Sequence, residues 1–192
     1  MQKSSFQLDK TYENKDFNTS PLPFGEYETC SFLSCNFSCC DLSNYSFIDC
    51  QFSSCDLNQI KLNNTSLRKV KFLDCQIMGV NFDECKPFLL SFSFENAKLD
   101  YSSFETCQLK SLKFKNSSLI AVNFSDCDLS NALFDDCNLQ QAIFERTKLE
   151  GADFRTSYAF SIDPEINLLK KAKFSRSSLS GLLDKYGIEI EE

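Results

Sequence analysis

Cysteine is the residue type in this chain best suited to chemistry, because the sequence contains eleven cysteines and no histidine. Thiols can form disulfides in a secreted protein, bind zinc, or act as nucleophiles. The absence of histidine removes the usual base of a Ser or Cys nucleophile and the commonest metal ligand. The five glycines are scattered and form no phosphate-binding loop. We therefore expect no enzyme activity and no cofactor.

The cysteines follow a repeat with a period of five residues. A large apolar residue, here called the centre, occurs at every fifth position from Tyr27 to Phe82 and again from Phe94 to Phe154. Nine cysteines lie two residues before a centre, namely Cys30, Cys35, Cys40, Cys50, Cys55, Cys75, Cys107, Cys127 and Cys137. Cys85 keeps this phase and Cys39 does not. Since Ala, Ser and Thr occupy the same slot elsewhere, we expect cysteine to pack there as a small, weakly polar residue.

Metal or redox chemistry is the alternative for these thiols. Zinc sites need converging sulfurs, usually two to four residues apart across a loop, whereas Cys30, Cys35 and Cys40 are five apart. If residues 20 apart stack, Cys35, Cys55 and Cys75 lie about 4.8 Å apart, which is within disulfide range. Their Cβ vectors would be parallel, however, and a cytoplasmic location would keep them reduced.

The elements that position these side chains are set by the same period. Five is neither the 3.6 of a helix nor the 2.0 of a strand. If each pentapeptide forms one side of a square, the chain returns to its starting point after 20 residues, and successive turns stack as parallel strands. The centres and the small residues two before them then point inward. The sequence therefore predicts an all-β solenoid held together by ladders of stacked Phe and Leu.

The repeated pattern of a small residue, Asp or Asn, Leu or Phe and two polar residues resembles that of the pentapeptide-repeat family. It occurs as CDLSN (40 to 44), CDLNQ (55 to 59), VNFSD (122 to 126), CDLSN (127 to 131), CNLQQ (137 to 141) and ADFRT (152 to 156). The resemblance implies a right-handed quadrilateral parallel β-helix of about seven coils.

Three regions are expected: an N-terminal capping strand and loop (1–26), the repeat array (27–160), and a last repeat followed by a C-terminal α-helix (161–192). Tyr12 to Phe17 is predicted to be the opening strand, before a loop with Pro21 and Pro23. The C-terminal helix is expected over 175–187, capped by Ser177 or Ser178 and ended by Gly187. Its apolar face comprises Leu179, Leu182, Leu183 and Tyr186.

Two roles are open for this helix. It can cover the open end of the last coil, or it can form a two-fold interface, since proteins of the family that this chain resembles often dimerise through such a helix. The resemblance therefore implies a homodimer through the C-terminal helix.

The repeat breaks once, over residues 83 to 93. Pro87 removes a backbone donor there, and Phe88, Leu89 and Leu90 follow in a row. These three residues, with the acidic Asp83 and Glu84 before them, are the candidate contact with a partner protein. The alternative is that the apolar triplet folds back on the coil, because an exposed apolar triplet is costly to leave uncovered.

The net charge of −7 and the pI near 4.7 argue against direct nucleic-acid binding and permit binding to a protein that itself binds nucleic acid. The resemblance extends to the family's quinolone-resistance and gyrase-inhibiting proteins, in the array, the Tyr12 to Phe17 opening and the ending GLLDKYGIEIEE. It implies DNA gyrase or topoisomerase IV as the partner of a rod that mimics duplex DNA.

The charge pattern fits that mimicry poorly. A seven-coil rod about 34 Å long would replace about 20 phosphates with only seven net charges. Opposite charges also alternate between coils, as in Glu95, Lys115, Asp135 and Arg155, in Asp41 with Lys61, and in Asp49 with Lys69. The remaining acidic candidates are Asp83, Glu84, Asp135, Asp136 and the tail residues Glu189, Glu191 and Glu192.

The sequence therefore predicts a non-enzymatic, protein-interaction scaffold of unknown partner, with the topoisomerase-binding DNA mimic as the alternative. No apolar run approaches the roughly 20 residues of a membrane span, and the first residues lack the apolar segment of a signal peptide. We expect a cytoplasmic protein that does not contact a membrane.

Overall fold

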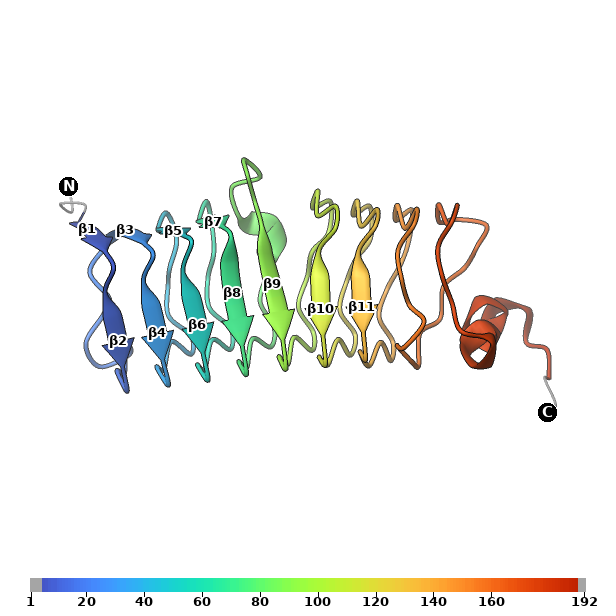
Figure 1. The fold of residues 1–192 in the computed structure, drawn as a ribbon, viewed down its shortest axis with the longest axis horizontal. Coiled ribbons are helices and arrows are strands. Elements are labelled where there is room, and N and C mark those ends of the chain that lie inside the picture. The colour runs from blue at the N-terminus through green and yellow to red at the C-terminus, as the bar shows by residue number, and fades with distance from the viewer. Residues whose placement is uncertain (1–4, 190–192) are drawn as a thin grey trace.

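The computed structural model describes residues 5–189, and in it the chain winds into a parallel β-solenoid (Figure 1). One side carries a four-stranded sheet and the adjacent side a seven-stranded sheet, all of whose strand pairs are parallel. The four-stranded sheet contains β1 (Ser5–Leu8), β3 (Gly25–Glu28), β5 (Ser46–Ile48) and β7 (Ser66–Arg68). The seven-stranded sheet contains β2 (Thr11–Glu13), β4 (Ser31–Leu33), β6 (Gln51–Ser53), β8 (Val70–Leu73), β9 (Phe92–Glu95), β10 (Lys113–Lys115) and β11 (Leu133–Asp135).

The pairing register confirms the predicted 20-residue coil. Phe32 pairs with Phe52, and Phe114 with Phe134. The other two sides are joined by single backbone pairings, such as Asn36 with Asp56. The seven strands of the longer sheet represent successive turns, as predicted for a solenoid of about seven coils.

Each corner of the square is a residue in the left-handed backbone region, two positions after a centre. Thr29, Ser34, Asn44 and Asp49 have φ between 50° and 68°. Short polar side chains tolerate this conformation best, which explains why Asn and Asp recur at this position. Cys39, the one cysteine out of phase with the others, is such a corner residue with φ 59°.

The core consists of the ring ladders that the repeat predicts. Phe32 and Phe52 stack with ring centroids 4.6 Å apart and planes 10° apart, while Phe47, from the adjacent side, meets Phe52 edge to face at 5.5 Å. Both arrangements are favourable for aromatic pairs. Burial of these centres, at about 2 kcal/mol each, is the main stabilising contribution.

The residue in the slot two before each centre also has a hydrogen-bonding role, which the sequence pattern did not predict. Its thiol or hydroxyl donates to the carbonyl of the centre one coil earlier, 23 residues back. Thr65 Oγ1 reaches the Leu42 carbonyl at 2.8 Å, Ser157 Oγ the Phe134 carbonyl at 2.8 Å, and Cys50 Sγ the Tyr27 carbonyl at 3.3 Å. A small donor is therefore preferred there, because it satisfies a buried backbone acceptor.

The break in the repeat is an insertion of two residues. Phe72 of β8 pairs with Phe94 of β9, 22 positions later, after the short 3₁₀ helix η1 (Phe82–Glu84). Lys86 N still donates to the Thr65 carbonyl at 2.8 Å, and Ser91 N to that of Leu67 at 3.0 Å, so the extra residues lie between these bonds. The four-stranded sheet ends at β7 because this loop replaces its next strand. Figure 1 shows the loop standing out of the solenoid just before β9.

Two predictions at the ends of the array were wrong in detail. The opening strand is β1, before the predicted Tyr12 to Phe17 segment, since Ser5–Leu8 pairs with β3. The predicted α-helix is a pair of 3₁₀ helices, η2 (Arg176–Leu182) and η3 (Asp184–Tyr186).

Docking on the preceding segment explains the 3₁₀ form. Backbone bonds three residues apart, such as Leu183 N to the Ser180 carbonyl at 2.8 Å, close the turns, while the Gly181 carbonyl accepts from Ile162 N of the preceding segment at 2.8 Å. The segment is short and serine-rich, so its own helix propensity is weak and docking decides its form. Ser175, rather than Ser177 or Ser178, precedes the first turn, without a side-chain capping bond. Gly187 ends η3 in the left-handed conformation, as predicted.

Within residues 5–189, no helix has the length and apolar character needed to span a bilayer.

Candidate interaction surfaces

The loop that interrupts the four-stranded sheet presents the most exposed aromatic side chain of the described chain. Phe88 is 71% exposed and Leu89 is 59% exposed, whereas Leu90 is half-buried and packs on the core. Only one member of the predicted apolar triplet therefore folds back. The other two stand out because two residues more than a coil needs must leave the solenoid.

A groove of about 280 Å³, here called the loop groove, lies between this loop and the outer face of the four-stranded sheet. Its floor is made of outward side chains from three successive strands. Among its lining residues are Gly25, Glu26, Ser46, Ser66, Lys86 and Phe88.

A second surface aligns five carboxylates along one side of the solenoid. Asp83 and Glu84 of η1 are exposed, and the register places Glu105, Asp126 and Glu145 on the following three coils of the same side. Arg146 is the one base at these positions, where it bonds Asp126 at 2.7 Å and Glu145 at 3.6 Å. We call these five carboxylates the acidic strip. Its first two members were predicted from the sequence, and the others were not, because only the coil register aligns them.

Elsewhere, charges of opposite sign pair between coils, in part as predicted. Lys115 Nζ bonds Glu95 at 2.8 Å, and Lys69 lies 3.5 Å from Asp49. Arg155, however, bonds Asp153 of its own repeat at 2.8 Å. The predicted pair between Arg155 and Asp135 of the preceding coil is therefore not formed. These exposed pairs contribute little individually.

Asp128 is the exception among the carboxylates, because it is only 3% exposed. Burial by itself would raise the pKa of this carboxyl. Hydrogen bonds from the Ser130 hydroxyl and N–H, with the charges of Lys110 and Lys148, outweigh burial and hold the pKa below its ordinary value. The Lys110 ammonium lies 3.5 Å away. Asp128 therefore acts as a structural anion in the middle of the rod.

The C-terminal 3₁₀ helices cover the last coil. Gly181 is buried, and a Cβ added to it would lie 2.2 Å from the Phe160 carbonyl oxygen, so the helix approaches as closely as a glycine allows. Leu182 packs on the core cluster, and Leu183 is half-buried. Leu179 is 44% exposed.

An ionic clamp holds the end of this cap. Lys185 Nζ lies 2.7 Å from Asp163 and 2.6 Å from Glu165, and the Tyr186 hydroxyl donates to Glu165 at 2.8 Å. Desolvation would lower the pKa of Lys185, but its bonds to the two carboxylates raise it. Of the four predicted helix residues, Leu182 and Tyr186 are thus engaged in the cap. Tail residue Glu189 is exposed, while Glu191 and Glu192 lie outside the described residues.

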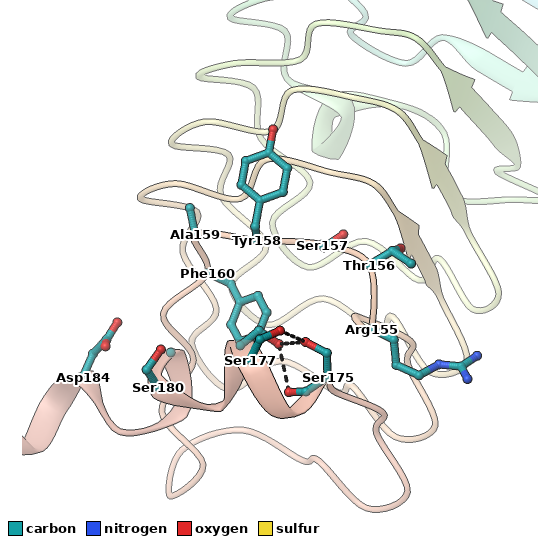
Figure 2. A pocket seen from close by; sticks show the side chains of 12 residues that line it. Arg155, Thr156, Ser157, Tyr158, Ala159, Phe160, Ser175, Ser177, Ser180 and Asp184 are labelled. Carbon is teal, nitrogen blue, oxygen red and sulfur yellow. Dashed lines mark hydrogen bonds between the residues drawn. The ribbon is translucent and has the colours of Figure 1, made fainter. Parts of the chain in front are cut away.

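A polar cavity of about 440 Å³ separates η2 from the segment 155–160 (Figure 2). Ser175 Oγ lies 3.1 Å from Ser177 Oγ and 2.8 Å from Ser178 Oγ. Figure 2 shows Ser175 and Ser177 beside the Phe160 ring. Tyr158 points away from this serine cluster. The lining of the cavity combines these serine hydroxyls with Arg155 and Asp184.

Most of the cysteine thiols are buried and none forms a disulfide. Nine of the eleven cysteines are buried, Cys40 is half-buried and Cys39 is exposed, and all are free. Burial raises the pKa of Cys50 to about 12, so this thiol stays protonated. Within residues 5–189, no three Cys, Asp or Glu side chains come close enough together to hold a metal ion.

The sequence matches the pentapeptide repeat region family over residues 26–104 and 88–182. The chain belongs to the pentapeptide-repeat family. These two matched segments include the whole array, the loop and all of η2, so the irregular loop is an insertion within a pentapeptide-repeat solenoid.

Solved pentapeptide-repeat structures share this fold. A trypsin-treated variant of QnrB1, a plasmid-mediated fluoroquinolone resistance protein, is 19% identical with a TM-score of 0.64, over 98% of this chain and 100% of that chain. HetL, a pentapeptide repeat protein involved in heterocyst differentiation regulation from the cyanobacterium Nostoc sp. strain PCC 7120, is 15% identical with a TM-score of 0.53, over 88% of this chain and 86% of that chain. No curated protein matches the sequence.

Proposed function

We propose that this pentapeptide-repeat protein is a non-enzymatic rod that binds another protein through the side of the solenoid where the loop emerges. The observation that carries this proposal is the exposure of Phe88 and Leu89 on an otherwise regular solenoid. Exposed aromatic and aliphatic residues beside a groove are typical of a contact surface. The free thiols fit a reducing, cytoplasmic location.

The test uses the natural chain and two variants as affinity baits. The contact variant is Phe88→Ala with Leu89→Ala, and the control is Tyr101→Ala, which removes an equally exposed aromatic ring outside the loop. A partner that binds the natural chain and the control should bind the contact variant about tenfold or more weakly. Equal binding to all three would exclude the loop as the contact.

The acidic strip supports a second candidate, a DNA mimic that binds a type II topoisomerase such as DNA gyrase or topoisomerase IV. Its five carboxylates follow the rod axis over four coils with one arginine among them. The fold shared with QnrB1, a fluoroquinolone resistance protein, is consistent with this candidate.

A gyrase supercoiling assay with and without a quinolone separates the two candidates. The mimic predicts inhibition or protection by the natural chain and its loss in Asp83→Lys with Glu105→Lys. The same number of reversals at Asp9 and Glu13, outside the strip, should leave the effect intact. No effect of the natural chain at any concentration would leave the first candidate alone.

We also propose that η2 and η3 form a homodimer interface in addition to capping the last coil. Because Leu182 and Tyr186 are already engaged, Leu179 is the apolar side chain available to a second copy. Sedimentation of Leu179→Asp tests this interface: a dimer of the natural chain that persists in the variant would argue against it.

A further inference from the structure

The loop groove has a defined length and floor. The register aligns Glu26, Ser46 and Ser66 on the outer face of three neighbouring strands, and Phe88 stands one coil further on. Three strand spacings separate Glu26 from that coil, which is about 14 Å. Phe24 and Phe88 also line the groove, and Arg68 Nε donates to the Ser66 hydroxyl at 3.3 Å.

The two ends of the groove carry opposite charges. Arg68 and Lys86 lie at its loop end and Glu26 at the opposite end. The ion pairs found among residues 5–189 include neither Arg68 nor Lys86. A suitable occupant is therefore an extended segment with apolar side chains along it and carboxylates concentrated at the end that meets the loop.

The chain itself contains such a segment. After Gly187 ends η3, the sequence continues Ile-Glu-Ile-Glu-Glu (188–192), and both Ile188 and Glu189 are exposed. Apolar and acidic residues alternate up to Glu191, so in an extended segment Ile188, Ile190 and Glu192 would share one face and Glu189 and Glu191 the other. Five extended residues span about 16 Å, close to the length of the groove.

This segment is too short to reach the groove of its own chain. On the side of the loop, the pairings Gln108–Asp128, Asp128–Lys148 and Lys148–Leu168 mark successive coils. The coil of Phe88 is thus about four strand spacings, or about 19 Å, from that of Leu168, and Gly187 follows the last coil. An occupant from this sequence must come from a second copy.

We propose that residues 188–192 of a second copy lie along the loop groove, with the isoleucines toward Phe88 and the serine floor and the last glutamates at Arg68 and Lys86. Because each copy has one segment and one groove, reciprocal exchange gives a closed pair. This contact goes beyond the partner binding proposed above, although both use Phe88, and it is a different interface from the one proposed for η2 and η3.

A charge-exchange experiment tests the proposal on full-length chains by analytical ultracentrifugation. One variant reverses the groove (Arg68→Glu with Lys86→Glu), and the other reverses the segment (Glu189→Lys, Glu191→Lys and Glu192→Lys). The natural chain should self-associate, and each variant alone should do so at least about tenfold more weakly. An equimolar mixture of the two should associate again, because both grooves then face segments of opposite charge.

Two controls make the result decisive. Circular dichroism and melting temperatures confirm that each variant is folded, and Phe88→Ala should weaken association without any change of charge. A natural chain that stays monomeric up to millimolar concentration, or a mixture that does not associate, overturns the proposal. So does self-association that persists in both charge variants and is lost in Leu179→Asp, which would assign it to η2.

Discussion

The interior of the solenoid should be more sensitive to loss of an aromatic ring than its end. Phe114 is fully buried and has four ring neighbours, with Phe94 and Phe134 stacked at 5.4 and 5.1 Å and Phe104 and Phe124 edge to face at 5.9 and 5.8 Å. Phe174, on the same ladder, is half-buried and has two ring neighbours, Phe154 stacked at 5.3 Å and Phe160 tilted at 5.5 Å. The same substitution at the two sites therefore removes different amounts of packing.

We expect Phe114→Ala to lower the free energy of unfolding by about 4 to 5 kcal/mol, the upper part of the range for a core Phe. The backbone pairing of the coils above and below holds the cavity open, so little of the loss is recovered by collapse. For Phe174→Ala we expect about 2 kcal/mol, since this ring is only partly buried and has fewer neighbours. In a chain of this size the difference corresponds to about 5 to 10 °C in melting temperature.

Urea and thermal unfolding, both followed by circular dichroism, give the two free energies. The natural chain and a conservative Phe114→Leu variant serve as references, and the leucine should restore more than half of the lost stability. If Phe174→Ala proves as destabilising as Phe114→Ala, the ring ladders do not hold the coils together as described.

Four further results are expected. Thr65→Val keeps the side-chain shape but leaves the Leu42 carbonyl without its buried donor. The free energy of unfolding should therefore fall by about 1 to 2 kcal/mol, and Thr65→Ser should retain most of the natural chain's stability. The pKa of Asp128 is lower in the folded chain than in the unfolded chain, where it is near 3.9. Its contribution to stability is therefore present above about pH 3.9 and is lost as the pH falls through the pKa of the folded state. Asp128→Asn should flatten the acid limb of a stability–pH profile below about pH 4. Gly181→Ala places a Cβ against the Phe160 carbonyl and should release the cap, seen as faster hydrogen exchange at Ile162 while the amides of β10 are unchanged. A thiol reagent should modify Cys39 first and Cys40 more slowly in the native chain, and the nine buried cysteines only on unfolding; rapid reaction of more than two thiols would contradict the packing role.

Much of the fold could be predicted because every coil repeats the same local sequence pattern. An apolar centre, a small residue two before it and a polar corner two after it recur often enough that no single exception changes the path of the chain. The prediction failed at the ends, where the repeat no longer applies. Ser5–Leu8 pairs with β3 although Gln7 occupies the centre position, and the serine-rich segment forms 3₁₀ turns because Gly181 must meet Phe160. Both outcomes depend on a neighbouring coil rather than on the local sequence.

The candidate surfaces were predicted less completely. Phe88, Leu89 and the two acids before them are visible in the sequence, because that is where the period fails. The acidic strip and the loop groove are not, since their members lie 20 or 22 residues apart and share a surface only after the insertion has shifted the register.

By itself, the sequence determined the solenoid, its coil length and the inward position of nearly all the cysteines, because a five-residue period of apolar residues can be buried in only one way. The tertiary structure decided what those small side chains bond to, since their acceptors belong to the coil before. It also decided which charges pair, which of three adjacent apolar residues returns to the core, and which face the loop leaves open. Each of these depends on stacking between distant residues, and the local pattern carries no information about that stacking beyond its spacing.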